Sequence, residues 1–138
     1  MRYFDASALV KRYVRERGTA KVRRLLTSDV TVTSRLSVVE IASALARRAR
    51  EGAFSDAARD RAVAAFDADL ASMLVVELTA VIAARAQALL RQHALRAGDA
   101  IQLASCLYMQ EALGEQTSFV VFDDCLANAA RLENLAVE

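Results

Sequence analysis

Short apolar segments alternate along the chain with longer stretches in which apolar residues recur every three or four positions. The short segments are rich in β-branched and aromatic residues, which is typical of buried strands. They predict strands at Arg2–Phe4, Val30–Thr33, Leu74–Leu78 and Ser118–Phe122, and an edge strand at Leu135–Val137. The periodic stretches predict helices at Ala6–Arg17, Thr19–Thr27, Leu36–Glu51, Ser55–Ala71, Thr79–His93, Gly98–Leu113 and Asp123–Leu132.

This alternation predicts the fold class. Strand–helix–strand repeats form a parallel sheet with helices on both faces, so we expect a three-layer α/β/α protein with a central parallel sheet of four or five strands. The chain has 138 residues, no proline and no repeat, which favours a single domain over residues 1–138. In such sheets ligands bind at the carboxyl ends of the strands, and a functional site is expected at that edge.

The net charge of +1 hides an uneven distribution. Residues 1–50 carry 12 Lys+Arg and 4 Asp+Glu, a balance of +8, whereas residues 51–138 carry 6 and 13, a balance of −7. Of the 18 basic residues all but Lys11 and Lys21 are arginine, whose planar guanidinium suits phosphate. The basic half favours contact with nucleic acid; arginine on solvated helix faces is the alternative.

Cysteine, histidine and hydropathy exclude several classes of site. Cys106 and Cys125 are too few for a disulfide framework or a cysteine metal motif, and we expect them to be reduced and partly buried. His93 is the only histidine, which rules out a histidine-rich metal site; a structural role near a helix end is expected. No apolar run is long enough to span a membrane and no secretory leader is recognisable, so the expected location is the cytoplasm.

Four acidic residues stand where the predicted strands end or the helices start. Asp5 and Asp123 each follow a strand, and Glu40 and Asp99 lie in or at the start of helices. Carboxylates gathered at one sheet edge repel each other unless a cation neutralises them. Oxygen ligands without histidine or cysteine suit Mg²⁺ or Mn²⁺, which activate water against a phosphodiester. The pattern therefore indicates metal-dependent cleavage of a nucleic acid.

Each of these acids also has a purely structural interpretation. Asp5 and Asp123 precede helices and suit the N-cap position, where a side-chain oxygen accepts a backbone N–H. Ser37 and Glu40 have the spacing of a capping box. Asp99 has Gln102 three residues on, a second pattern of that kind. Taken singly, each acid fits a cap; taken together, the four fit a metal site.

Four stretches each contain an acidic residue surrounded by small and apolar residues: Tyr3–Lys11, Ser34–Glu40, Leu95–Ala104 and Val120–Leu126. In this order and spacing they resemble the motifs of PIN domains, in particular the VapC ribonucleases of toxin–antitoxin pairs. The first stretch has an aspartate after a strand and a serine two residues later; the third is the most specific. The resemblance extends over essentially the whole chain.

The resemblance implies a PIN fold and a metal-dependent endoribonuclease that hydrolyses RNA to leave a 5′-phosphate and a 3′-hydroxyl. It implies Mg²⁺ or Mn²⁺ held by Asp5, Glu40, Asp99 and Asp123, directly or through water. Ser7 would orient Asp5 or a metal-bound water. It also implies that the protein is the toxin of a toxin–antitoxin pair, forms a homodimer, and binds a VapB-like antitoxin that covers the acidic crevice, with a basic residue in the place of the cation.

Two positions depart from the family pattern. The family usually has Thr or Ser two residues before its last acid, where this chain has Val121; the missing hydroxyl weakens the case for a second metal position. Val121 also leaves open a non-catalytic PIN-type module that binds RNA or a partner. The doublet Asp123-Asp124 leaves two choices for the fourth ligand, and Asp123 is favoured because Leu126 lies three residues on, as in the family.

The remaining expectations concern the substrate and a competing fold. Arg96 lies three residues before Asp99 and is expected to contact phosphate or pair with an acid. A signalling receiver domain is disfavoured, because it needs paired acids after the first strand and a lysine after the last one, and no lysine follows Lys21. Residue types do not separate RNA from DNA; the resemblance favours RNA. A basic track along the RNA backbone is expected from eight arginines: Arg12, Arg15, Arg17, Arg23, Arg24, Arg47, Arg48 and Arg50.

Overall fold

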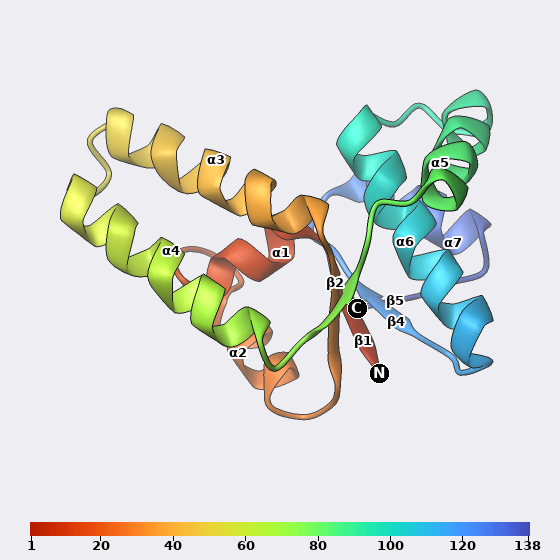
Figure 1. Ribbon diagram of the computed structural model, residues 1–138, viewed down its shortest axis with the longest axis horizontal. Helices are drawn as coiled ribbons and strands as arrows, with labels where there is room; N and C mark the ends of the chain where they lie inside the picture. Colours follow the sequence, from red (N-terminus) through yellow and green to blue (C-terminus); the bar gives the residue numbers. More distant parts are fainter.

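A five-stranded parallel sheet runs through the computed structural model, which describes residues 1–138 (Figure 1). The strands lie in the order β3-β2-β1-β4-β5. Every neighbouring pair is parallel, so the predicted α/β class and the upper strand number are confirmed. The strands are β1 (Arg2–Phe4), β2 (Thr31–Ser34), β3 (Leu74–Val76), β4 (Ser118–Val120) and β5 (Ala136–Val137).

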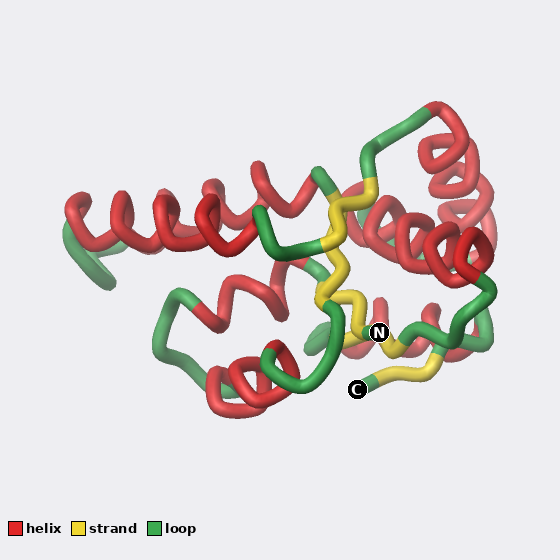
Figure 2. Tube along the Cα trace, turned by 60° about the horizontal axis from the view of Figure 1, so that its bottom comes forward, coloured by secondary structure: helices red, strands yellow, loops and turns green.

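Helices cover both faces of this sheet. Figure 1 shows α1 to α4 on one side and α5 to α7 on the other, and in Figure 2 the strands form a band between the two groups. The three-layer arrangement is therefore as predicted. The helices are α1 (Ala6–Leu9), the 3₁₀ helix η1 (Val10–Arg12), α2 (Thr19–Leu26), α3 (Leu36–Arg50), α4 (Asp56–Leu70), α5 (Ala80–Gln92), α6 (Ala97–Leu113) and α7 (Asp124–Leu132).

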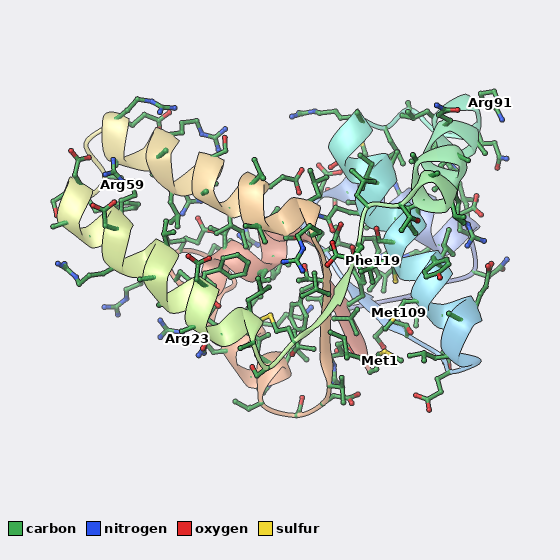
Figure 3. The ribbon with its side chains drawn as sticks, in the orientation of Figure 1. Met1, Arg23, Arg59, Arg91, Met109 and Phe119 are labelled. Carbon is green, nitrogen blue, oxygen red and sulfur yellow. The ribbon has the colours of Figure 1, made fainter.

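Two hydrophobic cores form because successive strand residues point to opposite faces. Tyr3 belongs to the core under α5, α6 and α7, whereas its neighbour Phe4 belongs to the core under α1 to α4, and both are fully buried. Phe119 packs edge-on against the Tyr3 ring, 5.5 Å between centroids, and lies in the interior beside α6, while Arg59 and Arg91 reach the periphery (Figure 3). The sheet is thus anchored from both sides.

The predicted helix Ala6–Arg17 is wrong in its second half. The α-helix ends at Leu9, passes into η1, and leaves a turn before α2. Thr19 holds this turn, since its Oγ1 accepts from the Glu16 N–H and donates to the Val14 carbonyl, both at 3.0 Å. Gly18 supplies the positive φ of 96° that the turn needs. Tertiary contacts therefore override a continuous helical pattern.

The order of the strands defines where the chain changes direction across the sheet. From β1 the chain moves to β2 and then β3 on one side, whereas β4 and β5 lie on the other side of β1. The gap between β1 and β4 is consequently a topological switch point, where ligands bind in open α/β sheets. None of the helices combines the length and the apolar character that a membrane span requires.

Candidate metal-binding cleft

Two of the predicted site residues, Asp5 and Asp123, lie at this switch point. Asp5 follows β1 and is the N-cap of α1; Asp123 stands three residues after the end of β4 and is the N-cap of α7. Each uses one oxygen as a cap, because Oδ1 of Asp5 accepts from the Ala8 N–H and Oδ1 of Asp123 from the Leu126 N–H, both at 2.8 Å. The predicted caps are confirmed, and each carboxylate keeps its second oxygen for another partner.

Asp5 is the most deeply buried of the acids, with 4% of its surface exposed. Ser7 donates its hydroxyl to Oδ2 of Asp5 at 2.6 Å, which is the contact expected if Ser7 orients this carboxylate. Burial raises the pKa of Asp5 to about 6, and repulsion by Glu40 adds to the rise, although the Ser7 and Ala8 hydrogen bonds oppose it. The fold therefore holds a carboxylate whose charge has no nearby positive partner.

Glu40 projects from α3 and packs against the first turn of α6. Gln102 donates its side-chain amide to Oε2 of Glu40 at 2.7 Å. A Cβ built on Gly98 would stand 2.5 Å from Oε1 of Glu40, so any larger residue at this position would displace the end of the Glu40 side chain. Burial raises the pKa of Glu40, repulsion by Asp99 adds to the rise, and the Gln102 hydrogen bond lowers it.

Asp99 interacts electrostatically with both Glu40 and Asp123. It lies in the first turn of α6 and is about half buried. Burial raises the pKa of Asp99 and repulsion by Asp123 adds to the rise, whereas the backbone and the guanidinium of Arg96 lower it. Repulsion thus runs from Asp5 to Glu40, from Glu40 to Asp99 and from Asp99 to Asp123, and the four predicted acids form one electrostatic group.

Three of the four acids line a common cleft of about 450 Å³ between α1, α3 and α6. Asp123 stands outside its lining, and a larger, mostly apolar hollow of about 610 Å³ lies away from the acids, beside α4. The cleft combines acidic, amide, hydroxyl and basic groups. They are Asp5, Glu40, Asp99, Ser7, Ser43, Gln102, Arg47 and Arg96.

The donor set of this cleft fits a hard divalent cation. None of the four acids forms an ion pair with Lys or Arg, so partly buried negative charge is left without a neutralising group, which favours a bound cation. As the side chains stand, no three of the acidic, histidine or cysteine groups enclose a single ion. Repulsion acts between successive pairs of these carboxylates.

Two predicted capping patterns are wrong. The helix α3 begins at Leu36 with Arg35 as its N-cap, so Ser37 lies inside the helix and is no capping box partner of Glu40. The helix α6 begins at Ala97 after the N-cap Arg96, which places Asp99 in the first turn and not at the cap. Glu40 and Asp99 do not have the predicted capping roles, and both line the cleft.

The sequence analysis missed one candidate of the cleft and did not single out another. Gln102, which the sequence analysis treated as a capping partner of Asp99, is 2% exposed and donates a hydrogen bond to Glu40. The sequence analysis named Arg47 only as one of eight arginines of a basic track, and it is the one of these eight that lines the acidic cleft. A signal existed for both, because Arg47 lies two helical turns after Glu40 and Gln102 one turn after Asp99, on the same faces.

The predicted basic track is reduced by ion pairs within the fold. Arg12 pairs with Asp69 at 2.6 Å and Arg48 with Glu16 at 2.6 Å, which occupies two of the eight arginines. Arg47 and the sequence-predicted Arg96 are exposed and reach the cleft from α3 and from the start of α6. Basic groups therefore flank the acids on two sides.

Burial and electrostatics distinguish the residues of the last predicted motif, Val120–Leu126. Val121 is 7% exposed and belongs to the core under α5 to α7, so its departure from the family pattern is absorbed in packing. Asp124 is the first residue of α7 and is exposed. The acid that repels Asp99 is Asp123, which favours Asp123 over Asp124 as the member of the cleft group.

The histidine and one cysteine are structural. His93 is the C-cap of α5, and its Nε2 lies 2.7 Å from Oε1 of Glu133, so the expected structural role is confirmed. Both cysteines are free; Cys106 is buried as expected, whereas Cys125 is exposed, contrary to expectation. Neither residue belongs to the cleft.

Comparisons with known proteins agree with this architecture. The chain is 40% identical to ribonuclease VapC45 of Mycobacterium tuberculosis over 111 residues, which are 76% of this chain and 74% of that protein. The crystal structure of VapC20 of the same organism, a toxin that cleaves the sarcin–ricin loop, superposes with a TM-score of 0.70 at 22% identity over 94% of this chain and 95% of that one. A toxin–antitoxin complex from Klebsiella pneumoniae gives a TM-score of 0.67 at 16% identity, over 92% and 91%. The sequence model of the PIN domain family matches residues 2–132, and the chain belongs to that family.

Proposed function

We propose that this protein is a metal-dependent endoribonuclease and the toxin of a toxin–antitoxin pair. The observation that carries the proposal is the group of carboxylates near the β1/β4 switch point, which repel one another and form no ion pair with Lys or Arg. A relative at 40% identity bears the name ribonuclease VapC45. The non-catalytic alternative is not favoured, because a module that only binds gains nothing from unneutralised acids held in a cleft.

The acids have distinct parts in the proposed site. When bound, Mg²⁺ or Mn²⁺ supplies an activated water and neutralises charge that develops on the phosphodiester. Asp5, Glu40 and Asp99 would hold the ion from inside the cleft, and Asp123 would do so from its rim. Ser7 keeps Oδ2 of Asp5 in place through the hydroxyl at 2.6 Å. Fixed ligands of this kind reduce the reorganisation needed during reaction.

Arg47 and Arg96 are proposed to hold the RNA backbone. Both are exposed, neither forms an ion pair within the fold, and both line the same cleft as the acids. A guanidinium on each side would bind the phosphates that flank the scissile one, while the acids repel an RNA strand that lacks the cation. The substrate and the metal would therefore bind in a mutually dependent way.

The proposed partner is a VapB-like antitoxin, and the proposed location is the cytoplasm. Solved relatives of this fold include a toxin–antitoxin complex. A basic side chain of the antitoxin would neutralise the cleft acids as a cation does. We also propose a homodimer. Isolation of the protein from its native operon should yield a small co-purifying protein, and light scattering of the purified toxin should give twice the chain mass.

The direct test is cleavage of matched RNA and DNA. End-labelled single-stranded and hairpin oligonucleotides of one sequence, as RNA and as DNA, would be incubated with the antitoxin-free protein in Mn²⁺ or in EDTA. We expect RNA to be cleaved in Mn²⁺ and not in EDTA, and the products to carry a 5′-phosphate. Equal cleavage in EDTA, or cleavage of DNA alone, would contradict it.

A further inference from the structure

Gln102 stands at the centre of a buried hydrogen-bond network outside the proposed ligand set. Its side chain is 2% exposed. The amide oxygen accepts from the Tyr3 hydroxyl at 2.7 Å, and the amide nitrogen donates to Oγ of Ser37 at 3.0 Å and to Oε2 of Glu40 at 2.7 Å. Both amide hydrogens are therefore used, and no buried side-chain atom of the protein is left without a partner.

The network allows only one orientation of the amide. An ionised carboxylate accepts hydrogen bonds and donates none, so Glu40 requires the nitrogen of Gln102 on its side. The phenol of Tyr3 donates to the oxygen on the opposite side. A flipped amide would place two oxygens against each other at Glu40 and lose both contacts. The direction of the Gln102 donor is therefore fixed by Tyr3 in β1.

The same network joins the elements that form the cleft. Ser37 lies 2.8 Å from the Thr33 hydroxyl, which in turn donates to the Phe4 carbonyl at 2.9 Å. These contacts tie together β1, β2, α3 and α6. A rotation of Glu40 away from Gln102 would break the only hydrogen bond that its carboxylate receives. Glu40 is thus positioned by a rigid frame that begins in the core.

We propose that Gln102 is the positioning residue for Glu40: it holds Oε2 and thereby leaves Oε1 as the oxygen that binds the divalent cation. The inference rests on the proposed metal-dependent function. Oε1 receives no hydrogen bond from the protein, and Gly98, on which an added Cβ would stand 2.5 Å from Oε1, has no side chain to cover it. Partners that orient a metal ligand typically change metal affinity or activity by about 10–100-fold when they are removed.

The test measures Mn²⁺ binding directly, by electron paramagnetic resonance of the free ion. Gln102→Met keeps the length and volume of the side chain and removes the amide. Gln87→Met is the matched control, since Gln87 is exposed on α5 and lies outside the cleft. We expect a Kd for Mn²⁺ about 10–100-fold weaker in Gln102→Met, an unchanged Kd in Gln87→Met, and recovery of RNA cleavage by Gln102→Met at high Mn²⁺ concentration.

Tyr3→Phe provides a second variant if Gln102→Met fails to fold, because it removes one hydroxyl and keeps the ring in the core. It frees the amide to turn, and a several-fold weaker Kd for Mn²⁺ is expected. Wild-type affinity in a folded Gln102→Met or Tyr3→Phe would overturn the role of Gln102 and leave the proposed nuclease intact. Absence of Mn²⁺ binding by the wild-type protein would overturn the proposed function, and the role of Gln102 with it.

Discussion

Substitution of Gly98 by alanine separates the stability of the protein from its activity. The added Cβ would lie 2.5 Å from Oε1 of Glu40, whereas carbon and oxygen normally approach to about 3.3 Å. The difference, about 0.8 Å, must be taken up by the end of the Glu40 side chain, because the helix backbone of α6 is fixed by its own hydrogen bonds. The shift would also strain the 2.7 Å contact between Glu40 and Gln102.

The expected effect on activity follows from that displacement. A misplacement of about 1 Å in a reacting group can lower a rate by about 100-fold, so we expect kcat/KM of Gly98→Ala to fall by roughly 10- to 100-fold. The effect on the fold has the opposite sign. Gly98 has no positive φ, and alanine is favoured over glycine in a helix by about 0.5–1 kcal/mol. The free energy of unfolding should be unchanged or slightly raised.

The assay pairs initial rates of RNA cleavage in Mn²⁺ with urea unfolding of the metal-free protein. Ala97→Ser is the control, since Ala97 is the exposed neighbour in the same helix turn and lies outside the cleft. A Gly98→Ala protein that folds normally and cleaves RNA within about twofold of the wild-type rate would refute the role assigned to the Glu40 contact.

Three further predictions test other parts of the cleft. Burial raises the pKa of Asp5 from 3.8 to about 6, so the metal-free fold binds this proton more tightly than the unfolded chain does, and its contribution to stability is lost as pH rises from about 4 to above 6. Asp5→Asn should therefore abolish cleavage yet stabilise the metal-free protein at pH 7 by about 1–3 kcal/mol. The gain in stability should be smaller at pH 4.5, and urea unfolding at both pH values measures it. A loss of stability at pH 7 would contradict this prediction. Ser7→Ala removes the 2.6 Å hydrogen bond to Asp5 and should lower kcat about 10-fold, measured at saturating RNA; an unchanged kcat would exclude the orienting role. Arg47→Ala should weaken RNA binding and reduce the slope of log affinity against log salt by about one, whereas Arg91→Ala, at the far end of α5, should not; equal slopes would remove Arg47 from the RNA contact.

The sequence predicted the fold well because its signals are local and strong. The buried strand β4 coincides with the start of the apolar run Phe119–Phe122, and alternation with helices leaves few topologies. The ends of elements were less accurate where tertiary contacts decide. The helix expected to reach Arg17 ends near Leu9, since Tyr13 donates its hydroxyl to Asp69 of α4 at 2.9 Å, a contact with no trace in the local sequence.

The candidate site was predicted in its acids and missed in its supporting residues. Asp5 and Asp123 follow strands, and the rule for parallel sheets places such residues at one edge. Its spacing from Asp99 places Gln102 on the face of the helix that lines the cleft, but its hydrogen-bond partners were not predictable, because Tyr3 and Glu40 are 99 and 62 residues away in the chain. Similarly, only the packing of α3 against α6 shows that a side chain at position 98 would meet the Glu40 carboxylate. Long-range contacts, and not residue types, distinguish these positions.

On the proposed function, the acids of the cleft carry metal-dependent cleavage of RNA. The most direct measurement compares cleavage of one labelled RNA in Mn²⁺ by wild type, Asp99→Asn and Asp67→Asn. Asp99 lines the cleft, whereas Asp67 is an exposed aspartate of α4 outside it. We predict that Asp99→Asn loses at least about 100-fold in rate and Asp67→Asn retains full activity. Equal activity of wild type and Asp99→Asn would contradict the account.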